Sequence, residues 1–230
     1  CVDTNTINDW KKYDESFELK ENADHEIKRM QFKLIQSKFN DKNLWFNNLN
    51  AQLESFDEKQ YDRLAPIILE KDIPSIQKEI IVGNLTYEEL VKFYLYRIKK
   101  IEFNSNTYLN SIISINPKII DEAIEKDKSK PNSIYSMHGI PILLKDNINF
   151  EGIPTTAGAV VLKNNYTINS YVSNKLEENG ALILGKTNLS EWAYYFCSGC
   201  PLGYSAIGGQ TLNPYGRKIF ESGGSSSGSG

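Results

Sequence analysis

The chain is poor in histidine and cysteine and has no long uncharged apolar run. Its 230 residues include two histidines and three cysteines, and the formal net charge is -3. Without an apolar run long enough to span a bilayer, the sequence predicts no membrane-spanning helix. The small negative charge gives no electrostatic reason to expect nucleic acid as a partner. Hydrophobic residues make up 40% of the chain, which is enough for a packed core.

The shortage of histidine decides how the glycine- and serine-rich segment 222–230 can act. Its sequence, SGGSSSGSG, matches G-x-S-x-G with Ser226 at the centre, which is the pattern of a hydrolase nucleophile elbow. That role needs a histidine later in the chain, but His25 and His138 both precede the serines. A phosphate-binding loop would need G-K-[ST], which does not follow. From its residues alone, the segment is compatible with a plain flexible loop or with a site of another kind.

The three cysteines predict two separate roles. Cys197 and Cys200 form a single C-x-x-C, and one such pair is weak evidence for zinc. Two free thiols and a local disulfide both fit this spacing, and outside the cytoplasm we favour the disulfide. Cys1 opens the chain, which predicts a lipid-modified cysteine followed by a polar tether over residues 1–8. The alternative is a chain boundary without a lipid.

Residues 9–83 are predicted to form a helical N-terminal extension. Apolar residues recur within 27–35 at the spacing of one helix face, and Asp57 is placed to cap a further short helix. Nothing in this extension carries an obvious chemistry. We therefore expect it to pack against the rest of the chain.

From residue 84 onward, the pattern predicts strands that alternate with helices. Thr86 followed by Glu89 is a capping box, which predicts the start of a helix. Strands are expected at 109–115, 140–144 and 181–184, and helices at 117–128, 173–179 and 188–196. This order predicts an α/β fold with a mixed, largely parallel central sheet covered by helices.

Lys145 is the candidate base. It follows the apolar run 140–144, and Asp146 and Asn147 then turn the chain, so it lies near the end of a strand where α/β folds place their sites. To act as a base it must be neutral, and burial without a carboxylate partner lowers the pKa of a lysine. Strand alternation points Asp146 to the other face. From these residues alone, a solvated surface lysine remains the alternative.

Two smaller features follow. One is a cluster of aromatic residues that could line an apolar substrate pocket, although we favour buried packing for it: Trp192, Tyr194, Tyr195 and Phe196. Lys186 is interpreted as structural.

Seven segments occur in an order that is specific as a series. They are LNSII from Leu109, HGIPILLKDN from His138, PTTAG from Pro154, GALILGKTNLSEWA from Gly180, GYSA from Gly203, GGQTLNPY from Gly208 and GGSSSGS from Gly223. Through them, the chain from about Thr86 to Gly230 resembles the amidase signature family. The match implies that residues 84–230 are the N-terminal part of such a domain and that the chain is truncated relative to a complete family enzyme.

The resemblance implies a Ser–Ser–Lys triad that hydrolyses amide C–N bonds without a metal or cofactor. The lysine matches Lys145, and the middle serine, held by a cis peptide bond, matches Ser225. Ser226 matches a neighbour that supports the hydrogen-bond network. The nucleophilic serine belongs to a further glycine-rich motif that has no match up to Gly230. A second chain or a missing C-terminal segment is therefore expected to complete the site.

The expected substrate is a small amide or a C-terminally amidated peptide. Together with Cys1, this favours a lipid-anchored amidase of the bacterial cell envelope, with a cytoplasmic protein as the alternative. Two other functions stay open. One is a non-catalytic envelope lipoprotein subunit derived from an amidase, and the other is an A-like subunit of a tRNA-linked amidotransferase.

Overall fold

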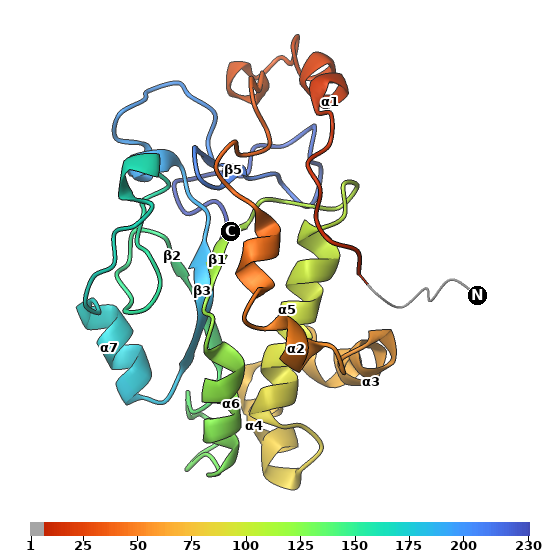
Figure 1. The fold of residues 1–230 in the computed structure, drawn as a ribbon, viewed down its shortest axis with the longest axis vertical. Helices are drawn as coiled ribbons and strands as arrows, with labels where there is room; N and C mark the ends of the chain where they lie inside the picture. Colours follow the sequence, from red (N-terminus) through yellow and green to blue (C-terminus); the bar gives the residue numbers. More distant parts are fainter. Residues whose placement is uncertain (1–6) are drawn as a thin grey trace.

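The computed structural model describes residues 7–230 and is built around a three-stranded sheet (Figure 1). Strand β3 (Leu182–Thr187) lies between β1 (Ile112–Ile115) and β2 (Pro141–Lys145). It runs parallel to β2 and antiparallel to β1. The sheet is therefore mixed, as the sequence predicts. All six residues of β3 are buried, whereas β2 is a half-buried edge strand rather than a fully buried one.

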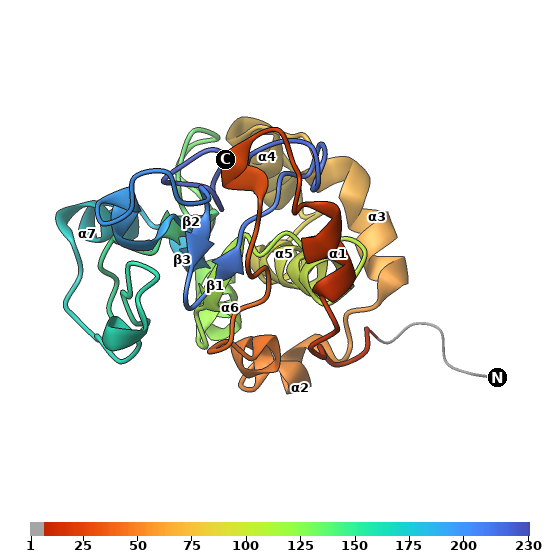
Figure 2. The same cartoon turned by 90° about the horizontal axis from the view of Figure 1, so that it is seen from above.

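Helices cover both faces of the sheet because the side chains of β3 alternate. Leu182 and Leu184 join the large core formed with α5 (Tyr87–Glu102) and α6 (Ile119–Asp127). Ile183 points the other way, into a small core that also receives Leu176 of α7 (Tyr171–Glu178). Figures 1 and 2 show α7 on one side of the sheet and α5 and α6 on the other.

Local capping signals set the helix ends. The capping box of Thr86 and Glu89 begins α5, and both of its reciprocal hydrogen bonds are present. The carboxylate of Asp127, at the end of α6, accepts hydrogen bonds from the first two backbone N–H groups of α5. Gly180 follows α7 with a φ of 86°, a conformation that favours glycine.

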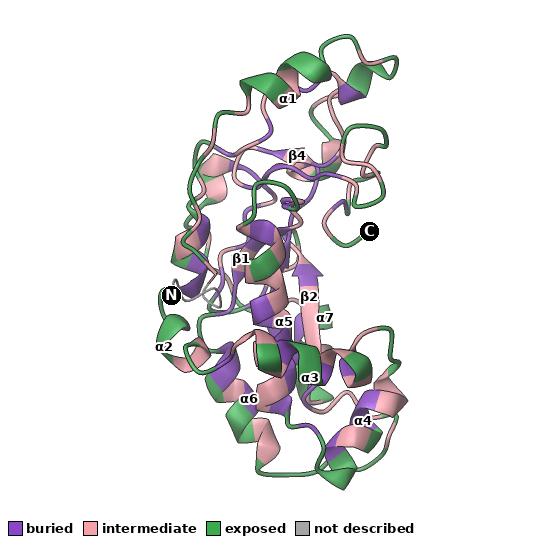
Figure 3. Cartoon of the chain, turned by 90° about the vertical axis from the view of Figure 1, so that its right-hand side faces the viewer, coloured by how far each residue is buried: buried purple, intermediate pink, exposed green. Residues whose placement is uncertain are grey.

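The N-terminal extension contains α1 (Ser16–Glu21), α2 (Asn50–Leu53), α3 (Glu58–Ile68) and α4 (Ile73–Val82), with short 3₁₀ turns between them. Asp57 caps α3 in a capping box with Gln60, as expected. The rings of Tyr61 in α3 and Phe93 in α5 stack with centroids 4.6 Å apart. The extension therefore shares the main core with α5 and α6 instead of standing apart from it. In Figure 3, buried residues run through the sheet and the inner faces of these helices.

The predicted helix over 27–35 is wrong. Only a 3₁₀ turn forms there, at Lys28–Met30, and the chain then runs irregularly. The carboxylate of Glu15 accepts hydrogen bonds from the backbone N–H groups of Ile35 and Gln36, at 3.2 and 2.7 Å. A remote side chain thus takes the donors that a helix would have bonded internally, while Met30 and Ile35 are still buried.

The predicted helix over 188–196 is also wrong. The chain forms a 3₁₀ turn at Glu191–Tyr194, within which Trp192 and Ala193 have positive φ angles of 53° and 55°. Asn188 does not cap a helix: its side-chain oxygen accepts from the Ser205 hydroxyl and the N–H of Leu189, and its amide nitrogen donates to Asn110 and to the segment of Gly209 and Thr211.

The remaining strands form a small hairpin of β4 (Tyr204–Ser205) and β5 (Gly209–Gln210). Within residues 7–230, no helix is long and apolar enough to cross a membrane. The same residues contain no group of three or more histidine, cysteine, aspartate or glutamate side chains that could hold a metal ion.

Candidate active site

Lys145 and Ser225 meet although they are eighty residues apart in the sequence. Lys145 is the last residue of β2, where it pairs in register with Thr187 of β3. Its Nζ atom lies 2.6 Å from Oγ of Ser225, and both residues are half-buried. At this separation a charged lysine donates to the hydroxyl, and a neutral lysine accepts from it.

The serine turn, which we define as residues 222–230, is held by backbone contacts to the segment after β3. The carbonyl of Ser225 accepts from the backbone N–H of Ser190 at 3.0 Å, and the carbonyl of Asn188 accepts from the N–H of Gly228 at 2.9 Å. The peptide bond between Gly224 and Ser225 is cis. Ser227 is buried, and its hydroxyl donates to the carbonyl of Gly223 at 2.7 Å. The end of β3 and the residues just after it therefore contact both β2, which ends at Lys145, and the serine turn.

The surroundings of Lys145 disfavour its charged form. Burial lowers the pKa of Lys145 below the usual lysine range, and among residues 7–230 no charged group adds to or opposes this effect. The neighbouring carboxylate of Asp146 points away from it and accepts hydrogen bonds from Thr156 and from the backbone N–H of Gly158. The alternation expected from the strand thus keeps the one nearby acid out of contact with the lysine.

A second buried pair fixes the loop that follows Lys145. Asp146 and Lys186 are fully buried, with the Lys186 Nζ atom 3.8 Å from the Asp146 carboxylate. The same Nζ donates to the carbonyl of Ile148 at 2.6 Å and to the Thr155 hydroxyl at 3.0 Å. Burial lowers the pKa of Lys186 to about 8 although Asp146 opposes the shift, and burial also raises the pKa of Asp146. This arrangement agrees with the structural role predicted for Lys186. The feature of the sequence that indicates this role is a single charged residue inside a buried strand.

The other serines of the turn have different settings. Ser226 is exposed, and within the described part of the chain its side chain makes no hydrogen bond, so its supporting role stays a prediction. Ser229, which sequence reasoning missed, has its hydroxyl 2.9 Å from the Thr187 hydroxyl. Thr187 is the register partner of Lys145, so Ser229 lies on the same end of the sheet.

The cysteine and aromatic predictions have separate outcomes. Cys197 and Cys200 are joined by a disulfide, with Cα atoms 5.6 Å apart. Cys1 lies outside the described residues.

The expected burial of the aromatic cluster is wrong, because Tyr195 and Phe196 are 85% and 72% exposed. The left-handed backbone just before them turns both rings out of the core.

Comparison with known proteins decides the family. The Amidase family model matches residues 89–230, which is more than half of the chain. This chain belongs to the amidase signature family. A probable amidase of Arabidopsis thaliana is 38% identical over 165 residues, covering 69% of this chain and 31% of the relative. The A-type subunit of the glutamyl-tRNA(Gln) amidotransferase of Maridesulfovibrio salexigens is 33% identical over 128 residues, covering 55% of this chain and 26% of the relative.

Solved structures of amidase signature enzymes have the same fold. An amidase family protein from Bacillus anthracis str. Ames superposes with a TM-score of 0.78 at 36% identity, over 86% of this chain and 40% of that one. The native peptide amidase of Stenotrophomonas maltophilia gives a TM-score of 0.66 at 39% identity, over 70% of this chain and 33% of that one. These matches confirm the predicted family and fold class. The chain spans about a third of the length of the relatives it matches.

Proposed function

We propose that the complete protein hydrolyses amide C–N bonds by serine acyl transfer, with Lys145 as base and Ser225 as proton relay. The observation that carries this proposal is the 2.6 Å contact between Lys145 Nζ and Ser225 Oγ. It is supported by the lowered pKa of Lys145, which has burial as its cause and no carboxylate partner. A lysine in such a setting loses its proton more readily than an exposed lysine, which favours its action as a base.

The proposed chemistry uses a relay of two proton transfers. Neutral Lys145 takes the proton of the Ser225 hydroxyl while Ser225 takes the proton of a nucleophilic serine. The nucleophile's oxygen forms a bond to the amide carbon, and the resulting tetrahedral intermediate expels the amine. The amine leaves with a proton returned from Lys145 through Ser225. Water then attacks the acyl ester while its proton passes through Ser225 to Lys145, and the proton returns by the same path to the leaving serine, which releases the acid and regenerates the serine.

The nucleophile is not assigned to any residue of this chain. We propose that a further segment or a second chain supplies it, because the relatives are about three times as long as the part matched. Membrane attachment through a lipid on Cys1, and with it a place at the bacterial cell envelope, is also a proposal. Mass spectrometry of the native N-terminal peptide tests it, and an unmodified Cys1 amine and thiol would exclude the lipid.

A small amide or a C-terminally amidated peptide is the proposed substrate class. The solved peptide amidase at 39% identity supports it. A second candidate is an amidotransferase A-like subunit, supported by the relatives of that name. The two differ in the fate of the released ammonia, which is free in a hydrolase and is passed to an acceptor in an amidotransferase.

Ammonia release from C-terminally amidated dipeptides and from small aliphatic amides tests the function. The complete protein should release ammonia without any acceptor, and Lys145→Met should slow the release by about 10²- to 10⁴-fold. Lys163→Met, which removes a lysine from the loop between β2 and α7, is the matched control and should keep the native rate. Activity should rise with pH through the lowered pKa of Lys145, because only the neutral lysine acts as base. Equal ammonia release by native and Lys145→Met protein would reject this assignment.

A further inference from the structure

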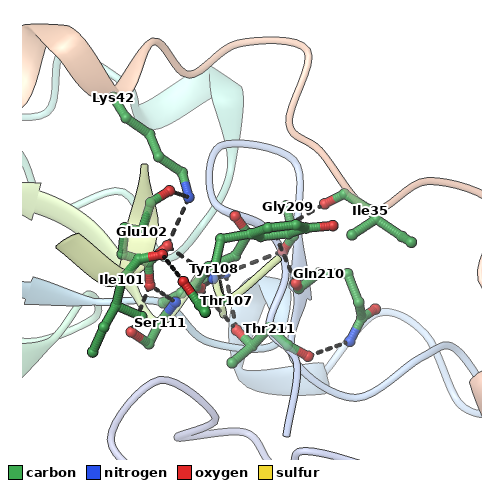
Figure 4. A network of polar contacts seen from close by, with 12 residues as sticks. Ile35, Lys42, Ile101, Glu102, Thr107, Tyr108, Ser111, Gly209, Gln210 and Thr211 are labelled. Atoms are coloured by element: carbon green, nitrogen blue, oxygen red, sulfur yellow. Dashed lines mark hydrogen bonds and ion pairs between the residues drawn. The ribbon is translucent and has the colours of Figure 1, made fainter. Parts of the chain in front are cut away.

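Lys42 of the N-terminal extension makes a buried contact with the end of α5. Its side chain is 5% exposed, and its Nζ atom lies 2.6 Å from the carboxylate of Glu102, which is 1% exposed. The same Nζ donates to the backbone carbonyl of Glu102 at 3.1 Å. Figure 4 shows the Lys42 ammonium pointing at Glu102 from the ribbon of the extension. Lys42 lies outside the part of the chain that the Amidase family model matches.

The Glu102 carboxylate holds the chain just before β1. It accepts from the backbone N–H groups of Asn110 and Ser111, at 3.0 and 2.9 Å, and from the Ser111 hydroxyl at 2.8 Å. Burial by itself raises the pKa of Glu102, but the charge of Lys42 and the donors of Ser111 outweigh it, so the pKa lies below the usual range. The ionised carboxylate, and with it this set of hydrogen bonds, depends on Lys42.

From Ser111 the contacts continue to the serine turn. The carbonyl of Ser111 accepts from the backbone N–H of Asn188 at 2.7 Å, and the carbonyl of Asn188 accepts from the N–H of Gly228 at 2.9 Å. A side chain at Gly228 would overlap the Ser111 carbonyl, so the turn is pressed directly against this junction. Two residues past Asn188, the N–H of Ser190 holds the carbonyl of Ser225.

We propose that Lys42 is a positioning residue that fixes the serine turn against Lys145 through Glu102, Ser111 and Asn188. The inference rests on the proposed function, since it concerns the same lysine and serine. It extends that function to a residue of the extension, for which sequence reasoning found no chemistry. Every contact in the path is shorter than about 3.2 Å, within the normal range of hydrogen bonds.

The test measures the titration of Lys145 in the full chain. Trace labelling of the folded protein with acetic anhydride across a pH series, with each lysine quantified by mass spectrometry, reports the apparent pKa of each lysine. In Lys42→Met we expect the titration of Lys145 to move upward toward the ordinary range, because a displaced serine turn lets water reach its Nζ atom. Lys42→Arg should restore the native titration. In the active protein, kcat should fall roughly 10- to 100-fold with KM unchanged, as for a misplacement of about 1 Å.

Two controls separate positioning from a general loss of stability. Leu64→Ala weakens the packing of the extension without touching this path, and it should leave the titration of Lys145 as in the native protein. If Lys42→Met does not fold, Ser111→Ala removes one donor of the Glu102 carboxylate and should shift Lys145 in the same direction.

Two results would overturn the inference. One is a native Lys145 titration in folded Lys42→Met or, where that variant does not fold, in Ser111→Ala, and the other is an equal shift in Leu64→Ala. The proposed function would fail separately, by a native protein that releases no ammonia or a native Lys145 that titrates in the ordinary range.

Discussion

Two lysines of this chain lie in polar junctions, one where the extension meets the core and one at the end of β2, and they differ in their partners. Lys42 faces a buried carboxylate at 2.6 Å, and the pKa of that carboxylate is held below its usual range. Lys145 faces a serine hydroxyl at the same separation, and burial lowers its own pKa. The first contact holds the Glu102 carboxylate in its charged form, and the second has the geometry that the proposed proton exchange requires.

The comparison indicates that the partner of a lysine, together with its burial, decides its role. Lys186 is intermediate, because Asp146 lies 3.8 Å away and yet burial lowers the pKa of Lys186 to about 8. A carboxylate in direct contact stabilises the ammonium, whereas a hydroxyl only completes its hydrogen bonding. Changing the partners should therefore exchange the behaviour of the two sites.

The largest expected effect is on catalysis at the uncharged pair. Lys145→Met should lower kcat/KM for amide hydrolysis by about 10²- to 10⁴-fold, the usual contribution of a general base. The free energy of unfolding should change little, because Lys145 is only half-buried and has no ionic partner. Steady-state assays and urea unfolding of the same sample check both statements. A large loss of stability with retained activity would reverse the comparison.

The next effect is on stability at the ionised pair. Lys42→Met leaves the Glu102 carboxylate buried without its cation, and this should lower the free energy of unfolding by about 3–5 kcal/mol. Urea unfolding followed by circular dichroism measures the loss. Lys42→Arg is the conservative control and should recover most of it. A loss of less than about 1 kcal/mol, the value of an exposed pair, would show that the junction does not depend on this charge.

A third substitution should make the Lys145 site behave like the Lys42 site. Ser225→Asp places a carboxylate beside Lys145, which should raise the pKa of that lysine and hold it charged. The chain should fold, and amide hydrolysis should be lost. Ser225→Ala is the control, because it removes the relay without supplying a charge. Trace labelling gives the pKa of Lys145 in both variants, and a Lys145 that titrates alike in the two would contradict the comparison.

The half of this picture that depends on local sequence was predictable. A capping box needs only residues three apart, so the one at Thr86 was predicted in full, and Asp57 was predicted as a helix cap without its partner Gln60. The apolar run before Lys145 gave the strand and placed the lysine at its end. The pairing of Lys145 with Ser225 came from the family resemblance, because no local pattern joins residues eighty apart.

The half that depends on distant side chains was not predictable. The periodicity at 27–35 indicated a helix, but Glu15 takes the backbone donors of that segment. Asn188 is a good capping residue by type, and it instead joins Asn110, Gly209 and Thr211. The Lys42–Glu102 pair spans sixty residues of sequence, and neither residue stands out locally. In each of these cases, a polar side chain forms a hydrogen bond or an ion pair with a residue that is distant in the sequence.

Acid should weaken the contact between Lys42 and Glu102. The pKa of Glu102 is lower in the folded chain than in the unfolded one, so its contribution is complete above the unfolded value of about 4.3 and is lost as pH falls through the folded value. Between pH 5 and 3, native protein should lose more unfolding free energy than Glu102→Gln. Urea unfolding at a series of pH values gives both slopes. Parallel slopes would mean that Glu102 does not couple folding to protons.

The smallest expected effect is at an exposed ion pair that also joins the extension to the core. Arg63 of α3 lies 2.6 Å from Glu89 of α5, but their side chains are 52% and 33% exposed. Water solvates both charges, so Arg63→Met should cost only about 0–1 kcal/mol and leave the titration of Lys145 unchanged. Urea unfolding and trace labelling of this variant measure both quantities. If Arg63→Met costs as much as Lys42→Met, the two ion pairs contribute equally to stability. Burial of the charge would then not be what makes the Lys42 junction important.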